Sequence, residues 1–177
     1  MLDRVKVLIS AQEIDAKLAE MGRAITEDYR GKELLMVGIL KGAFMVMADL
    51  ARHVDLPVEF DFMAVSSYGA ATKSSGVVRI LKDLDEEIAG RHVLIVEDII
   101  DSGLTLRYLM RSLRVRQPAT LELAALLVKD GVERPPTEIK YEGFHIPPQF
   151  VIGYGLDYVE KYRNLPYVGV VEGGLGD

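Results

Sequence analysis

The sequence predicts an α/β protein with a mainly parallel central sheet flanked by helices. The expected elements alternate strand, helix, strand, helix and strand, which is the order that builds such a sheet. Three short runs are almost entirely apolar, as strands covered on both faces are. Each run ends abruptly in charged residues, which mark the ends of the buried segments. These runs are ELLMVGIL at 33–40, VLIV at 93–96 and LELAALLV at 121–128.

The first helix is predicted to begin after Ser10. Ser10 and Glu13 have the three-residue spacing of a capping box, and Gly31 would end the helix. A strand over 33–40 and a helix over 43–54 come next. The apolar stripe of the first helix recurs at helical spacing and consists of Ile14, Leu18, Met21 and Ile25.

The middle of the chain predicts two paired strands and a loop. Residues 58–64 alternate apolar and acidic side chains, which is typical of a strand with one partly wet face. Residues 66–75 are small and polar and predict a mobile loop, and 77–84 predicts the partner strand. A helix is expected just after the acids that follow 93–96. Its apolar positions are Leu106, Leu109, Met110 and Leu113, and further short strands are expected at 150–155 and 167–171.

Composition narrows the class of protein. The chain has 177 residues, and we expect a single domain over 1–177. Its net charge of −6 argues against nucleic-acid binding, which uses a basic surface. Because it has no cysteine, it forms no disulfide and no cysteine-type zinc site, and it suits a reducing cytoplasm. No signal peptide is apparent, and no apolar run reaches the roughly 20 residues that span a bilayer.

The acidic stretch after the strand at 93–96 is the strongest functional signal. Ligands of parallel sheets bind beyond the carboxyl ends of the strands. The stretch Asp101–Thr105 (DSGLT) enters a helix there, so its backbone N–H groups and hydroxyls predict a phosphate cradle. Glu97 and Asp98 suit ribose hydroxyls or Mg²⁺, and Asp101 is left to exchange a proton. Together they suggest a phosphorylated sugar as ligand. Neither a Walker loop nor a dinucleotide fingerprint is present.

The stretch VLIVEDIIDSGLTL at 93–106 closely resembles the 5-phosphoribosyl-1-pyrophosphate (PRPP) signature of type I phosphoribosyltransferases. Further stretches resemble the bacterial hypoxanthine-guanine phosphoribosyltransferases, and the resemblance covers roughly residues 5 to 172. It implies the type I phosphoribosyltransferase fold, with a small hood built from the termini. These further stretches are LKGAF at 40–44, SSYG at 66–69, LLVK at 126–129 and FVIGYGLDYVEKYRNLPYVGV at 150–170.

The resemblance implies a role for each residue around PRPP. Glu97 and Asp98 would meet the ribose hydroxyls directly or through Mg²⁺, and Asp101 would be the general base. Lys41 and Gly42 resemble the pyrophosphate loop, where the peptide between the pair can be cis. The 5′-phosphate would bind Ser102, Gly103, Leu104 and Thr105, although some relatives have lysine in place of Leu104. Arg163 would contact pyrophosphate, and Asp157 would be the second carboxylate on the metal side.

Other residues would bind the purine or close the site. Lys129 would contact the 6-oxo group, which excludes adenine because two donors would then face each other. Phe150 would stack on the base, Val151 would offer backbone groups to its edge, and Leu156 would pack near the ring, next to Asp157. Ser67 and Tyr68 match the family's lid.

The implied reaction transfers the 5-phosphoribosyl group from PRPP to hypoxanthine or guanine, giving IMP or GMP and pyrophosphate, with Mg²⁺ as cofactor. The implied assembly is a homo-oligomer, either a dimer or a tetramer. Two alternatives remain open at this point. One is a xanthine-preferring enzyme, and the other is a non-catalytic PRPP-binding regulator, which the acidic charge and the lack of a DNA-binding segment disfavour.

Overall fold

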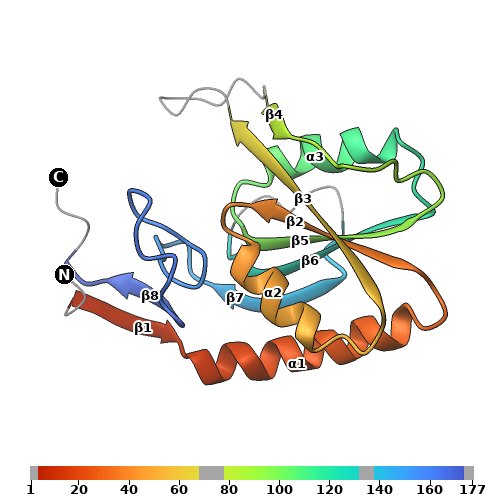
Figure 1. The fold of residues 1–177 in the computed structure, drawn as a ribbon. Helices are drawn as coiled ribbons and strands as arrows, with labels where there is room; N and C mark the ends of the chain where they lie inside the picture. Colours follow the sequence, from red (N-terminus) through yellow and green to blue (C-terminus); the bar gives the residue numbers. More distant parts are fainter. Residues whose placement is uncertain (1–3, 68–77, 132–137, 174–177) are drawn as a thin grey trace.

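The computed structural model describes residues 4–67, 78–131 and 138–173. Its centre is a six-stranded sheet in the order β4-β3-β2-β5-β6-β7 (Figure 1). The strands from β3 to β7 run parallel, and β4 pairs antiparallel with β3 at one edge, as the sequence predicts for 77–84. The strands are β2 (Leu34–Leu40), β3 (Val58–Ser67), β4 (Val78–Lys82), β5 (His92–Ile100), β6 (Thr120–Lys129) and β7 (Tyr141–Ile146).

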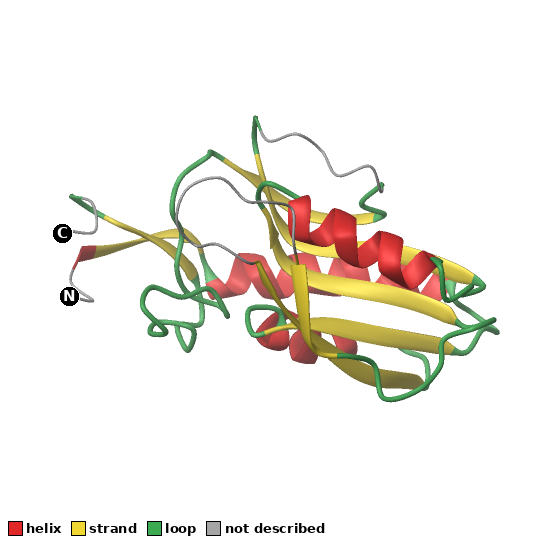
Figure 2. Ribbon diagram, turned by 90° about the horizontal axis from the view of Figure 1, so that it is seen from above, coloured by secondary structure: helices red, strands yellow, loops and turns green. Residues whose placement is uncertain are grey.

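Helices cover both faces of this sheet (Figure 2). The helices α1 (Ala11–Asp28) and α2 (Phe44–Arg52) lie on one face, and α3 (Leu104–Arg114) lies on the other. Alternate residues of a strand point to opposite faces, so the sheet builds two cores. Met36 and Leu94 pack with α1 and α2, whereas their neighbours Val37 and Ile95 pack with α3. The α/β class predicted from the apolar runs is therefore confirmed.

The predicted start of the first helix is also confirmed. The Ser10 hydroxyl accepts a hydrogen bond from the Glu13 amide at 3.2 Å, and the Glu13 carboxylate accepts one from the Ser10 amide at 2.8 Å. This reciprocal capping box satisfies two amide groups that a helix start otherwise leaves without acceptors.

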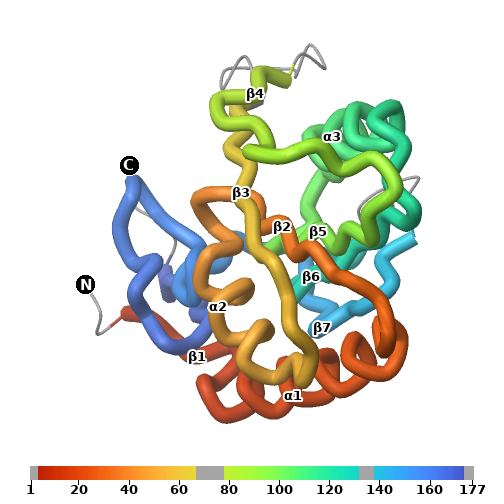
Figure 3. Tube along the Cα trace, turned by 45° about the vertical axis from the view of Figure 1, so that its right-hand side comes forward, coloured from red at the N-terminus to blue at the C-terminus, as the bar shows by residue number. Residues whose placement is uncertain are grey.

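A small second sheet joins the two ends of the chain. Strand β1 (Val5–Ile9) pairs antiparallel with β8 (Val168–Val171), and this sheet is the hood that the family resemblance implies. Figure 3 shows the blue C-terminal segment beside α2 and β1. The hood therefore brings residues after 150 to the carboxyl end of β2.

Three sequence expectations need correction. β5 runs to Ile100 rather than ending at 96, so the acidic pair belongs to the strand. Residues 150–155 form turns with isolated bridges instead of a strand. The sequence reading also missed β1 and β7. Among the described residues, no helix has the length and apolar character needed to cross a membrane.

Candidate active site

The acidic pair lies where β5 separates from β2. The last pairing between these two strands joins Gly38 to Val96, and β5 then continues only along β6. β2 leads through α2 to β3 on one side, while β5 leads through α3 to β6 on the other. This is the topological switch point of the sheet, the place where such folds bind ligands. Glu97 and Asp98 therefore stand at the bottom of the expected crevice.

Burial disfavours the charged form of both acids. Burial raises the pKa of Glu97 well above its usual range, and the charge of Asp98 adds to this. Burial also raises the pKa of Asp98 to about 6, although a 2.8 Å hydrogen bond from the Ile99 amide and the charge of Arg163 oppose the rise. Such carboxylates are stabilised by a cation or by hydroxyl donors.

The predicted phosphate cradle joins β5 to α3. Gly103 has φ of 70° and stands at the N-cap of α3, a conformation that favours glycine. The first amide groups of α3 have no acceptors within their own helix and point toward this turn. A cavity of about 230 Å³ opens here, and its lining includes Asp101, Ser102, Gly103 and Thr105. Leu104 lies at the same turn with its side chain 42% exposed.

The predicted general base and the predicted purine-reading lysine are in contact. The Lys129 ammonium lies 2.8 Å from a carboxylate oxygen of Asp101. Their closeness follows from the sheet register, because Ile100 is paired with Val128, Asp101 directly follows the end of β5, and Lys129 is the last residue of β6. Asp101 keeps a largely exposed side chain, whereas that of Lys129 is mostly covered.

The turn after β2 brings the expected pyrophosphate loop against the acids. The described residues contain a cis peptide bond between Leu40 and Lys41, one bond before the Lys41–Gly42 peptide that the family resemblance marks. A Cβ atom on Gly42 would lie 1.8 Å from an Asp98 oxygen, and one on Gly155 would lie 2.1 Å from the Gly42 carbonyl oxygen. Only glycines permit these approaches, which pack Gly42 between the acidic pair and the C-terminal segment.

The C-terminal segment contributes a network of charges. Arg163 donates to the Gly155 carbonyl oxygen at 2.7 Å and lies 3.1 Å from Asp157 and 3.3 Å from Glu160. Glu160 also lies 2.7 Å from the Lys41 ammonium. The sequence predicts Lys41, Asp157 and Arg163 as site residues, but neither Gly155 nor Glu160. No periodic signal marks Glu160, because its partner Lys41 lies 119 residues away along the chain.

The expected purine side is only partly open. The Phe150 ring is 51% exposed and meets Tyr158 edge to face, with ring centroids 6.1 Å apart. Val151 and Leu156 are buried members of the core beneath α1 and α2. Ser67 ends β3, and Tyr68 lies outside the described residues, so the expected lid stays a prediction.

The acids suit a magnesium ion that a substrate helps to hold. No three acidic, histidine or cysteine side chains of the described residues are grouped closely enough to enclose a metal. Mg²⁺ is usually bound by one or two carboxylates together with phosphate oxygens and water. Asp98 and Asp157 are near enough for the charge of Asp157 to raise the pKa of Asp98. A divalent cation would relieve this repulsion, so the residues fit the predicted cofactor.

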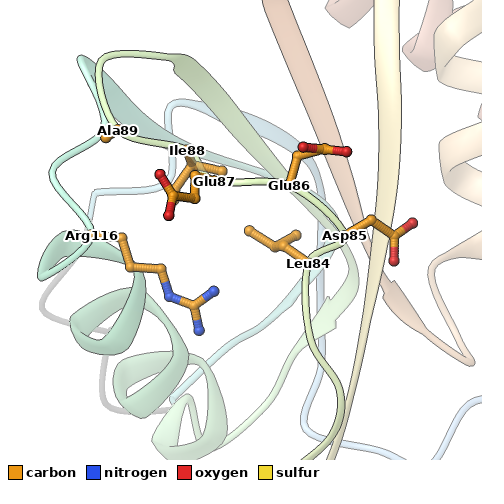
Figure 4. Close-up of a pocket in the computed structure, with 7 residues that line it drawn as sticks. All are labelled: Leu84, Asp85, Glu86, Glu87, Ile88, Ala89 and Arg116. Carbon is orange, nitrogen blue, oxygen red and sulfur yellow. The ribbon is translucent and has the colours of Figure 1, made fainter.

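A second cavity lies away from these groups. It has a volume of about 430 Å³ and forms where the chain approaches the amino end of β5 (Figure 4). Arg116 faces Leu84 across it, and its guanidinium is paired with Asp83 at 2.7 Å and 2.8 Å. This cavity is outside the carboxyl edge of the sheet and has no part in the site described above.

Comparison with known proteins agrees with this geometry. Residues 8–159 match the phosphoribosyl transferase domain family. Hypoxanthine-guanine phosphoribosyltransferase from Mycobacterium avium is 52% identical over 96% of this chain and 87% of its own length. The enzyme of the same name from Bacillus subtilis is 50% identical over 96% and 94%. A crystal structure of a hypoxanthine phosphoribosyltransferase from Staphylococcus aureus superposes with a TM-score of 0.93, at 44% identity over 97% of this chain and 94% of that one.

The fold and the site thus define a type I phosphoribosyltransferase, with a hood sheet over the carboxyl edge of the central sheet. Its matches over nearly the full chain narrow this class. The chain belongs to the hypoxanthine-guanine phosphoribosyltransferase family.

Proposed function

We propose that this protein transfers the 5-phosphoribosyl group of PRPP to N9 of hypoxanthine or guanine. The products are IMP or GMP and pyrophosphate, so the protein is a purine salvage enzyme. The observation that carries the proposal is the convergence of the phosphate cradle, the acidic pair and Lys129 at one switch point. A substrate with a phosphate, a ribose and a 6-oxopurine matches that combination of groups.

In this reaction the cradle Ser102–Thr105 holds the 5′-phosphate through amide and hydroxyl donors. Glu97 and Asp98 orient the ribose hydroxyls, and Asp98 and Asp157 would hold Mg²⁺, which when bound stabilises the charge of the leaving pyrophosphate. Lys41, Gly42 and Arg163 bind the pyrophosphate group. The anomeric carbon passes through an oxocarbenium-like state, as in glycoside chemistry.

The purine stacks on Phe150, Val151 offers backbone groups to its edge, and Leu156 packs near the ring. Lys129 turns from Asp101 to the 6-oxo group, which frees the Asp101 carboxylate. Asp101 then takes the proton that the purine loses as its nitrogen attacks the ribose. The ion pair between Lys129 and Asp101 supports this order of events. The Lys129 ammonium is a hydrogen-bond donor, so an oxo group of the substrate can replace Asp101 as its partner, whereas an amino group cannot.

The decisive experiment is an assay with four bases. The protein is incubated with PRPP, Mg²⁺ and each of hypoxanthine, guanine, xanthine and adenine, and nucleotide formation is followed. We expect IMP and GMP and at most slow reaction of adenine. Highest kcat/KM for xanthine would favour the xanthine-preferring alternative. PRPP binding without any nucleotide formation would favour the regulator.

We further propose a cytoplasmic homo-oligomer, either a dimer or a tetramer. The lack of cysteine supports the location. An apolar groove between α2 and β3 supports the assembly, because Phe44 and Phe60 are 38% and 51% exposed along it and Phe62 lines its floor. Sedimentation at micromolar concentration tests this proposal, and a monomer at all concentrations would contradict it.

A further inference from the structure

One carboxylate joins the two cations that the proposed function assigns to pyrophosphate. Glu160 places one oxygen 2.7 Å from the Lys41 ammonium and its other oxygen 3.3 Å from the Arg163 guanidinium. Lys41 comes from the turn after β2, and Arg163 comes from the C-terminal segment. Glu160 is therefore a bridge between two separate parts of the site, and its charge stands where an anionic ligand of both cations would lie.

The backbone holds Glu160 in this place. Residues 158–161 form a tight turn, in which the Tyr158 and Lys161 amides each donate to the other residue's carbonyl oxygen at 3.0 Å. Val159 and Glu160 have φ of 50° and 60°, which is uncommon outside glycine, asparagine and aspartate. The Glu160 amide also donates to Asp157 at 2.9 Å. Such a strained turn persists only when its surroundings support it, so the position of Glu160 is specified and not incidental.

The bridge is nevertheless easy to open on one side. The side chains of Lys41 and Glu160 are 67% and 65% exposed, and exposed ion pairs contribute little to stability. Arg163 is only 20% exposed and keeps its bonds to Gly155 and Asp157 without Glu160. Its Nε–H is buried and has no hydrogen-bond partner among the described residues. Opening the bridge therefore leaves Arg163 in place and frees the guanidinium N–H group that donates to Glu160.

We propose that Glu160 is a positioning residue that acts as an internal counter-anion for the pyrophosphate site. It holds Lys41 and Arg163 while the site is free, the pyrophosphate group of PRPP displaces it, and it takes the two cations back when pyrophosphate leaves. Glu160 thereby weakens pyrophosphate binding and speeds product release. The inference rests on the proposed function, because that function assigns Lys41 and Arg163 to pyrophosphate.

The test is the affinity of the protein for magnesium pyrophosphate, measured by calorimetry without turnover. Glu160→Gln keeps the shape of the side chain and removes the competing charge. We expect its Kd for pyrophosphate to fall about three- to tenfold, the size expected for relief of one or two exposed ion pairs. Inhibition by product pyrophosphate should become tighter by a similar factor, while KM for hypoxanthine should stay unchanged.

The matched control is Glu20→Gln on α1, which removes the same charge from an exposed ion pair with Lys17 at 3.1 Å. Its Kd for pyrophosphate should equal that of the wild type. An unchanged or higher Kd in Glu160→Gln overturns the inference, as does an equal fall in both variants. Glu160→Asp, whose shorter side chain loses reach to Lys41, should show a smaller fall and covers the case in which the glutamine variant does not fold.

The experiments distinguish a failure of the proposed function from a failure of this inference. If the wild type binds pyrophosphate but forms no nucleotide from PRPP and any purine, the function is wrong while the affinity comparison still decides the role of Glu160. If the wild type forms IMP and Glu160→Gln binds pyrophosphate like the wild type, only the inference is wrong.

Discussion

Replacing Gly155 with alanine should disturb the pyrophosphate loop from outside it. The added Cβ would stand 2.1 Å from the Gly42 carbonyl oxygen and 3.2 Å from its carbon, both of them backbone atoms. A side-chain rotation cannot relieve such an overlap, so either the turn after β2 or the C-terminal segment must move. Gly155 also has φ of +95°, which an alanine adopts only with strain.

The loss of folding stability in Gly155→Ala has two parts, which a control variant can separate. Backbone strain at positive φ costs about 1–2 kcal/mol, and overpacking costs a further 1–3 kcal/mol. We expect a total of about 3 kcal/mol, which lowers Tm by about 6–12 °C in a chain of this size. Gly31→Ala is the control, because Gly31 has φ of +77° with no atom within 4 Å of the added Cβ. Gly31→Ala should lose only the stability that backbone strain at positive φ costs.

Thermal unfolding and pyrophosphate binding of both variants are the assays. Gly155→Ala should bind magnesium pyrophosphate at least tenfold more weakly, because Gly42 is displaced from the acidic pair, while Gly31→Ala should bind it like the wild type. Equal losses of Tm in the two variants would show that the contact between Gly155 and Gly42 is not close, and the description of this part of the site would be wrong.

Three further predictions concern other parts of the molecule. Asp101→Asn should keep the Kd for PRPP and lower kcat about 10²–10⁴-fold, since it removes the proton acceptor; an unchanged kcat excludes Asp101 as the base. Lys129→Met should raise the adenine-to-hypoxanthine ratio of kcat/KM by tenfold or more, and an unaltered ratio means that Lys129 does not read the base. Asp61 is buried, which by itself would raise its pKa, but hydrogen bonds from the Asp85 and Phe62 amides at 2.8 Å and 2.7 Å and the Lys82 ammonium lower it. Because the folded pKa lies below the unfolded value of about 3.9, this carboxylate stabilises the fold above that pH and stops doing so as pH falls through its folded pKa. Asp61→Asn should therefore cost about 1–3 kcal/mol in urea unfolding at pH 7 and much less near pH 2, and a cost independent of pH would contradict the assignment.

Local patterns were sufficient for the scaffold. The apolar runs predicted the buried strands because a strand covered on both faces has no polar positions to show, and Ser10 with Glu13 predicted the start of α1 because the capping box is a contact between near neighbours. The cradle was predictable for the same reason, since Asp101–Thr105 joins one strand directly to the next helix.

Long-range pairing decided what the patterns missed. The acids after Val96 predict the end of the strand, but pairing of Glu97 with Ala125 and of Ile99 with Leu127 carries β5 to Ile100. β1 was not recognised because most of its side chains are partly or fully exposed and its partner β8 lies at the other end of the chain.

By itself, the sequence determined the parallel sheet, the acidic pair, the cradle and the family to which they belong. Only the tertiary structure decided the pair between Lys129 and Asp101, the cis bond at Leu40, and the bridge of Glu160 to Lys41. The physical reason is distance along the chain. Periodicity reports whether a side chain faces the core or water, whereas the partner of a charged group depends on where the folded sheet and hood bring remote segments together.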